Sequence, residues 1–258
     1  YQSSSMIGPI LASAAATVVN IFSTTDILWR VCFWCGGIAG ISGYILRRYA
    51  LPQNKNKKKI ALIPNKTYVK IIWQYKRKIL CIAITTVFSH ITYIIPFIFM
   101  NSFIPLISNI TLSTMLTLNT ILLIINILLI LLIGRLLTKF NPKKILLISS
   151  LTLACTILPI LQDLNHTSII YVTCVRLWFI ILGVIFVCPL YYWYKKILDV
   201  PDNYLLIGIG TTLGAATLGR MTTVICLSLW YMTGTTFCFA IYLMIIAFIT
   251  AYAISSVQ

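Results

Sequence analysis

Eight apolar runs, each close to 20 residues long, account for most of this chain. An α-helix needs about 20 apolar residues to cross a bilayer. Spans are helical because the bilayer core holds no water to hydrogen-bond with unpaired backbone groups. Charged residues make up only 9% of the 258 residues, and the mean hydropathy is +0.97. A soluble domain carries about 25% charged residues, so a soluble fold is excluded. We therefore predict an all-α, polytopic transmembrane helix bundle in the lipid bilayer, with spans at about residues 6–23, 27–46, 79–100, 112–133, 145–161, 169–192, 205–231 and 235–255.

The basic residues are distributed unevenly between the loops of this bundle. Of the 20 Lys and Arg residues, eleven lie in residues 47–78, four in 135–144 and two at 195–196, whereas the intervening loops hold none. Cytoplasmic loops of membrane proteins are enriched in Lys and Arg. The alternation predicts that every second loop, and both ends of this chain, lie in the cytoplasm. The net charge of +16 then follows topology, and we expect no nucleic-acid partner.

The second predicted span carries a pattern found in one family of transporters. It opens with Trp29-Arg-Val-Cys-Phe33, continues through Gly36-Gly-Ile-Ala-Gly40-Ile-Ser-Gly43 and ends at Arg47-Arg48. This pattern resembles the sixth helix of major facilitator superfamily transporters of the metabolite:proton symporter group, with the proline/betaine transporters as the nearest members. The basic segment that follows is similar to the central cytoplasmic loop between the two six-helix halves of that family.

A second resemblance follows the fourth predicted span. The segment Gly134-Arg-Leu-Leu-Thr138-Lys139-Phe-Asn141-Pro-Lys143-Lys144 is similar to the superfamily's Gly-x-x-x-Asp-Arg-x-Gly-Arg-Arg loop. Gly134, Lys139, Lys143 and Lys144 match that pattern, whereas Thr138 stands at its acidic position. The resemblance implies a cytoplasmic gating loop that lacks the carboxylate of the family pattern.

The resemblance also implies an organisation in three parts. Residues 1–46 correspond to the last two helices of the N-terminal half, residues 47–78 to the central loop, and residues 79–258 to the C-terminal six-helix half. The chain then matches helices five to twelve, and the missing N-terminal helices of the same transporter are an expected partner. The implied function is transport of a small polar metabolite or osmolyte by alternating access, coupled to protons, in a bacterial inner membrane.

Polar side chains inside the predicted spans are the candidate substrate-binding groups, because such groups at membrane depth usually face a cavity or a partner. Arg176 and Arg220 carry fixed charges, and a planar guanidinium suits a carboxylate-bearing substrate. His90, with Tyr93 one turn on, is a candidate proton relay because an imidazole exchanges protons near neutral pH. Asn119 shares a helix face with a second asparagine seven residues on and is expected to point inward. For each residue a structural role, such as hydrogen bonding between helices, stays open.

Two alternatives to transport remain, a membrane scaffold with eight helices and a truncated remnant that does not transport. We predict no enzymatic activity, no metal and no cofactor, because the sequence holds no metal-ligand cluster, phosphate-binding loop or nucleophile–base pair.

The motifs Gly36-x-x-x-Gly40 and Gly210-x-x-x-Gly214 predict close packing between helices, since small residues let two backbones approach.

Overall fold

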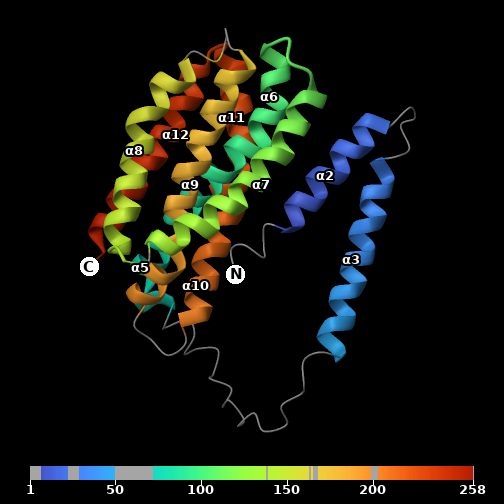
Figure 1. The fold of residues 1–258 in the computed structure, drawn as a ribbon. Coiled ribbons are helices and arrows are strands. Elements are labelled where there is room, and N and C mark those ends of the chain that lie inside the picture. Colours follow the sequence, from blue (N-terminus) through green and yellow to red (C-terminus); the bar gives the residue numbers. More distant parts are fainter. Residues whose placement is uncertain are drawn as a thin grey trace.

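The chain is all-helical in the residues that its computed structural model describes, which are 7–22, 29–49, 72–137, 139–162, 164, 168–198 and 203–257 (Figure 1). In chain order the elements are α2 (Ile7–Phe22), α3 (Trp29–Tyr49), α5 (Lys76–Ile94), η1 (Ile95–Phe99), α6 (Met100–Ile107), α7 (Leu112–Leu137), α8 (Pro142–Gln162), α9 (Ile169–Ile197), α10 (Asn203–Gly214), η3 (Ala215–Gly219), α11 (Arg220–Thr233) and α12 (Thr236–Ser256). The two η elements are single π-helical segments.

Six helical spans in these ranges are long and apolar enough to cross a membrane. Four are the single helices α7, α8, α9 and α12, while α5–η1–α6 and α10–η3–α11 are each one span interrupted by a π-helical segment. The first two predicted spans also form helices, α2 and α3, whose apolar runs at Gly8–Thr17 and Gly36–Leu46 are shorter. The predicted fold class, an all-α transmembrane bundle, is confirmed.

The third predicted span is longer in the structure than its sequence pattern indicates. The prediction ends near residue 100, but α6 continues the same span to Ile107. Pro96 lies at the start of η1 and has no amide hydrogen to donate to the helical ladder. The wider π-helical segment accommodates this lost hydrogen bond, so the helix continues instead of ending.

The core lies between α5, α8, α9 and α12, which pack against one another. Aromatic rings fill it: Phe88 lies 4.6 Å from Phe186 between centroids, and Phe239 lies 5.3 Å from Phe99. The helix α7 packs on α9, and α2 packs on α7. In Figure 1, α3 lies beside α2 and apart from the six-span bundle. Large apolar side chains on the outside of the helices remain exposed, as a surface that faces lipid requires.

Glycines bring the α10–η3 segment into direct contact with α5. A Cβ added at Gly210 would lie 2.7 Å from Cγ2 of Ile82, and one at Gly214 would overlap the α5 backbone. A Cβ at Gly219 would lie 3.2 Å from Cβ of His90. The predicted close packing is therefore confirmed for the glycine pair of α10. Around the glycine pair of α3, no described atom from a neighbouring element lies within 4 Å of either Cβ position.

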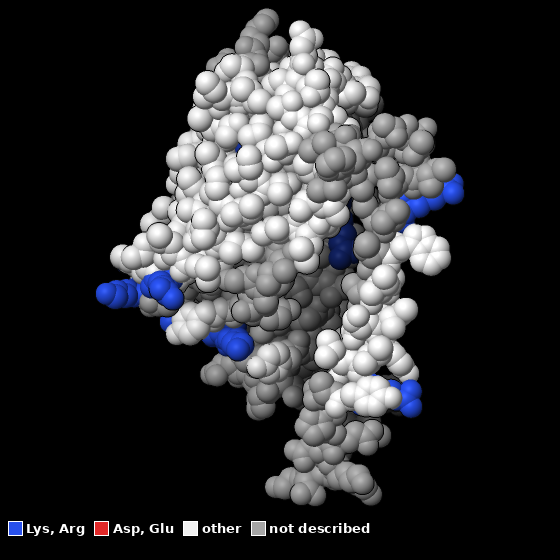
Figure 2. All heavy atoms as spheres, turned by 45° about the vertical axis from the view of Figure 1, so that its right-hand side comes forward, with Lys and Arg blue, Asp and Glu red and all other residues white. Residues whose placement is uncertain are grey.

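Basic side chains gather at one end of the six-span bundle, below an almost uncharged surface (Figure 2). Two of them bind the ends of neighbouring helices. Nζ of Lys78 donates to the carbonyl oxygen of Ile197 at 2.8 Å, and Nζ of Lys143 donates to that of Val257 at 2.6 Å. These bonds join the starts of α5 and α8 to the ends of α9 and α12. The basic loops flanking these helices therefore lie at one end of the bundle, although most of the segment 47–78 falls outside the described residues.

Candidate functional site

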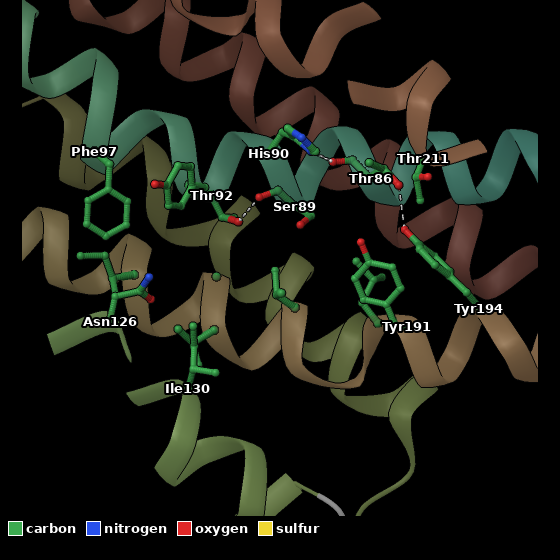
Figure 3. A pocket seen from close by; sticks show the side chains of 16 residues that line it. Thr86, Ser89, His90, Thr92, Phe97, Asn126, Ile130, Tyr191, Tyr194 and Thr211 are labelled. Atoms are coloured by element: carbon green, nitrogen blue, oxygen red, sulfur yellow. Dashed lines mark hydrogen bonds between the residues drawn. The ribbon is translucent and has the colours of Figure 1, made fainter. Parts of the chain in front are cut away.

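A half-open cavity of about 230 Å³ lies between α5, α7, α9 and α10. Its α9 wall is largely apolar, with Ile180 and Val184 facing the space. Phe97 and Asn126 lie at one end of the cavity, while Tyr194 and Thr211 lie at the other (Figure 3). Sites for small molecules combine apolar walls with a few placed polar groups, and this cavity has that character.

The α5 wall of the cavity carries a row of polar side chains. Thr86, His90 and Tyr93 follow one another at intervals of four and three residues, with Ser89 and Thr92 beside them. Nδ1 of His90 lies 3.0 Å from the carbonyl oxygen of Thr86, one turn earlier. One face of α5 therefore offers hydroxyl and imidazole groups to a molecule in the cavity. The predicted candidates His90 and Tyr93 are both part of this wall.

Tyr194 holds the far end of the cavity wall in place. Its hydroxyl oxygen lies 3.0 Å from Oγ1 of Thr85 and 2.9 Å from Oγ1 of Thr86, and the side chain is fully enclosed. The same hydroxyl donates to the carbonyl oxygen of Ile82 at 3.3 Å. A satisfied hydrogen-bond cluster in an apolar setting is rigid. It fixes α9 against α5 at this end.

A second cavity, of about 260 Å³, adjoins the first. Four residues line both cavities: Thr86, His90, Tyr191 and Thr211. The predicted candidate Arg220 lines only the second, where it begins α11 with an exposed side chain. Directly before it, η3 is bent at Thr217, whose φ and ψ are −83° and −113°. The imidazole of His90 therefore lies between two cavities, next to a break in the α10–α11 span.

Arg176 and Asn119 lie outside the two cavities, between α9 and α7. Arg176 on α9 is 0% exposed, and its Nη2 donates to Oδ1 of Asn119 on α7 at 2.6 Å. Nδ2 of Asn119 donates in turn to Oγ of Ser13 on α2 at 3.3 Å. Neither Arg176 nor Asn119 lines the two cavities described above. The structure thus pairs these two candidates with each other and separates them from His90 and Tyr93.

The segment that resembles a gating loop lies at the basic end of the bundle. Lys143 is held there by its hydrogen bond to the end of α12. Lys139 and Lys144 are exposed, and Gly134 is half-buried near the end of α7. The threonine at the acidic position of the pattern, residue 138, falls outside the described residues.

The sequence model of the Major Facilitator Superfamily matches residues 1–197, which is more than half of the chain. The chain belongs to the Major Facilitator Superfamily. Comparisons with curated proteins and with solved structures gave no significant match. This superfamily member is a multi-pass membrane transporter, which confirms the predicted transport class, and its family consists of transporters and not of enzymes.

Several cavity-lining side chains of this superfamily member were missed by sequence reasoning: Thr86, Tyr191, Tyr194 and Thr211. A signal existed for Thr86, because it lies four residues before His90 and must share its helix face. The two tyrosines stand near the basic end of α9, where tyrosine is common as an anchor at the membrane interface. Only the packing of α9 on α5 reveals that Tyr194 points inward.

Proposed function

We propose that this transporter carries a small polar metabolite or osmolyte of the proline/betaine type by alternating access, in symport with protons. One observation supports it above all: a cavity with a polar wall lies between the helices of a superfamily member. Polar groups at membrane depth cost free energy, so their concentration around a cavity favours transport over a scaffold role.

In this proposal the residues of the two adjoining cavities contact the solute. His90 and Tyr93 hydrogen-bond to it from α5, and His90 takes up and releases the coupling proton. Arg220 contacts the solute from the second cavity, beside His90. The π-helical breaks η1 and η3 are the points at which the spans bend during alternating access, since transporter sites are typically formed by interrupted helices.

The chain divides into parts of the two transporter halves and the loop that connects them. Residues 1–46 belong to the N-terminal half, which the missing N-terminal helices of the same transporter complete, and residues 79–258 form the C-terminal half. Residues 47–78 connect the halves on the cytoplasmic side of a bacterial inner membrane. The clustering of basic side chains at one end of the bundle supports this cytoplasmic side, because cytoplasmic loops are rich in Lys and Arg. In this proposal the segment at that same end acts as the gating loop, with Gly134, Lys139, Lys143 and Lys144.

Uptake of labelled proline and glycine betaine into proteoliposomes tests the proposal, with the full native gene product reconstituted. We expect uptake above that of protein-free vesicles, increased by an inwardly directed proton gradient. His90→Gln should abolish the increase, because glutamine keeps a polar group of similar size that cannot exchange a proton.

Two tyrosine variants provide a matched comparison. Tyr93→Phe removes a hydroxyl from the cavity wall and should lower uptake several-fold. Tyr252→Phe changes a ring that is 75% exposed on α12 and should leave uptake unchanged. A folded, inserted protein that neither binds nor takes up either solute refutes the proposal and favours the scaffold or remnant alternative.

A further inference from the structure

Arg176 is buried with most of its hydrogen-bonding capacity unused. The side chain is 0% exposed, yet its Nε and Nη1 atoms have no hydrogen-bond partner among the described residues. Only Nη2 is bonded, to Oδ1 of Asn119 at 2.6 Å. A guanidinium stays charged and carries five N–H donors, so its burial without an anion is unfavourable.

The described part of the chain offers this guanidinium no counter-charge. The chain has four acidic residues, none of them among the described ones: Asp26, Asp163, Asp199 and Asp202. Asn119 is neutral, and its own amide nitrogen donates to Oγ of Ser13. Buried charges in proteins are normally paired with an opposite charge. The geometry around Arg176 is therefore that of a site prepared for an anion.

Arg176 lies one helical turn before Ile180, the first residue of α9 that lines the first cavity. Ile180 is one turn further along α9, Asn126 is two turns beyond Asn119 on α7, and both line that cavity. Residues four or seven apart share a helix face, so the Arg176–Asn119 pair continues the cavity-lining faces of α9 and α7, but it is enclosed between the two helices outside the cavity. Phe97, in one apolar cluster with Ile180, lies at this end of the cavity (Figure 3).

We propose that Arg176 binds the carboxylate of the transported solute, at a site beyond the Phe97 end of the cavity. This inference rests on the proposed function and narrows its substrates to carboxylates, whether anionic or zwitterionic. A carboxylate accepts two parallel N–H bonds from one edge of a guanidinium. With Asn119 on one hydrogen of Nη2, the other hydrogen and a neighbouring N–H group still form such an edge. Asn119 is a positioning residue, itself held by Ser13 on α2.

Binding of two pairs of probes to the full native protein in lipid nanodiscs tests this site. Glycine betaine and choline share a trimethylammonium group, proline and prolinamide share a ring, and in each pair only the first has a carboxylate. We expect the wild-type protein to bind each carboxylate at least about tenfold more tightly than its partner, or 1.4 kcal/mol. Arg176→Gln should lose this preference, whereas Arg48→Gln, at an exposed position of α3, should keep it.

The unfolding temperature of the ligand-free protein separates binding from a structural role. The side-chain amide of glutamine can still donate to Oδ1 of Asn119. Removal of the Arg176 charge leaves no carboxylate among the described residues without its partner. Arg176→Gln should therefore unfold at a temperature equal to or above that of the wild type. A fall of more than about 4 °C, or a variant that does not fold, would assign Arg176 a structural role and overturn the proposal.

The binding and uptake measurements together distinguish failure of the carboxylate site from failure of the proposed transport function. Equal affinity within each probe pair, absence of binding by all four probes, or a preference that survives Arg176→Gln would overturn the carboxylate site. Uptake in proteoliposomes can persist in the first and third cases, so the proposed function survives there. Carboxylate-selective binding that depends on Arg176, without any uptake, supports the site and counts against transport.

Discussion

Replacing Gly214 by alanine should destabilise the protein, because α10 has no room for a methyl group at this point. The added Cβ would lie 2.9 Å from Cβ of Thr86 and 3.0 Å from the carbonyl carbon of Ala83, and it would overlap the carbonyl oxygen of Ala83. A backbone carbonyl inside a helix cannot move aside as a flexible side chain does. Overpacking of this kind costs about 1–3 kcal/mol, whereas glycine to alanine in a helix gains about 0.5–1 kcal/mol. The ranges leave a net loss of up to about 2.5 kcal/mol, with about 1 kcal/mol as the central expectation.

Gly208→Ala is the matched control on the same helix. Within the described parts of the chain, no neighbouring atom lies within 4 Å of its Cβ position, so only the gain in helix propensity remains. We expect this variant to be as stable as the wild type or more stable by up to about 1 kcal/mol. Unfolding of the purified protein in mixed micelles, followed by tryptophan fluorescence during a detergent titration, measures both. Equal midpoints for Gly214→Ala and Gly208→Ala would refute the close contact between α10 and α5.

Two further variants test contacts at the cavity end and at the basic end of the bundle. Tyr194→Phe removes a hydroxyl that hydrogen-bonds to two threonines of α5, and it should lower the free energy of unfolding by about 0.5–1.5 kcal/mol in the same titration. Tyr252→Phe, at an exposed position, should change it by less than about 0.5 kcal/mol, and equal losses would contradict the network. Lys143→Gln should free the end of α12 and speed hydrogen exchange of its last-turn amides, measured by mass spectrometry. Exposed Lys144→Gln should leave that exchange unchanged, and no difference between the two variants would argue against the bond.

The sequence by itself determined the helices and the family. A bilayer demands about 20 apolar residues for each span, so the lengths of the runs predict α7, α8, α9 and α12 to within a few residues. Basic loops occur at alternate connections, and the structure brings the described ones to one end of the bundle. The superfamily resemblance rested on two local motifs, and the match over residues 1–197 confirms it, while the proline/betaine subgroup stays a prediction.

Only the tertiary structure decided which polar groups share a site. Helical periodicity tells which residues lie on one face of a helix, but not which helix that face meets. The approach of α10 to α5 depends on missing side chains at Gly210 and Gly214, more than 120 residues from the partner surface in sequence. That packing places His90 between two cavities, while the packing of α7 on α9 encloses Arg176 with Asn119. The physical reason is that helix contacts depend on side-chain volumes at distant positions, which no local pattern records.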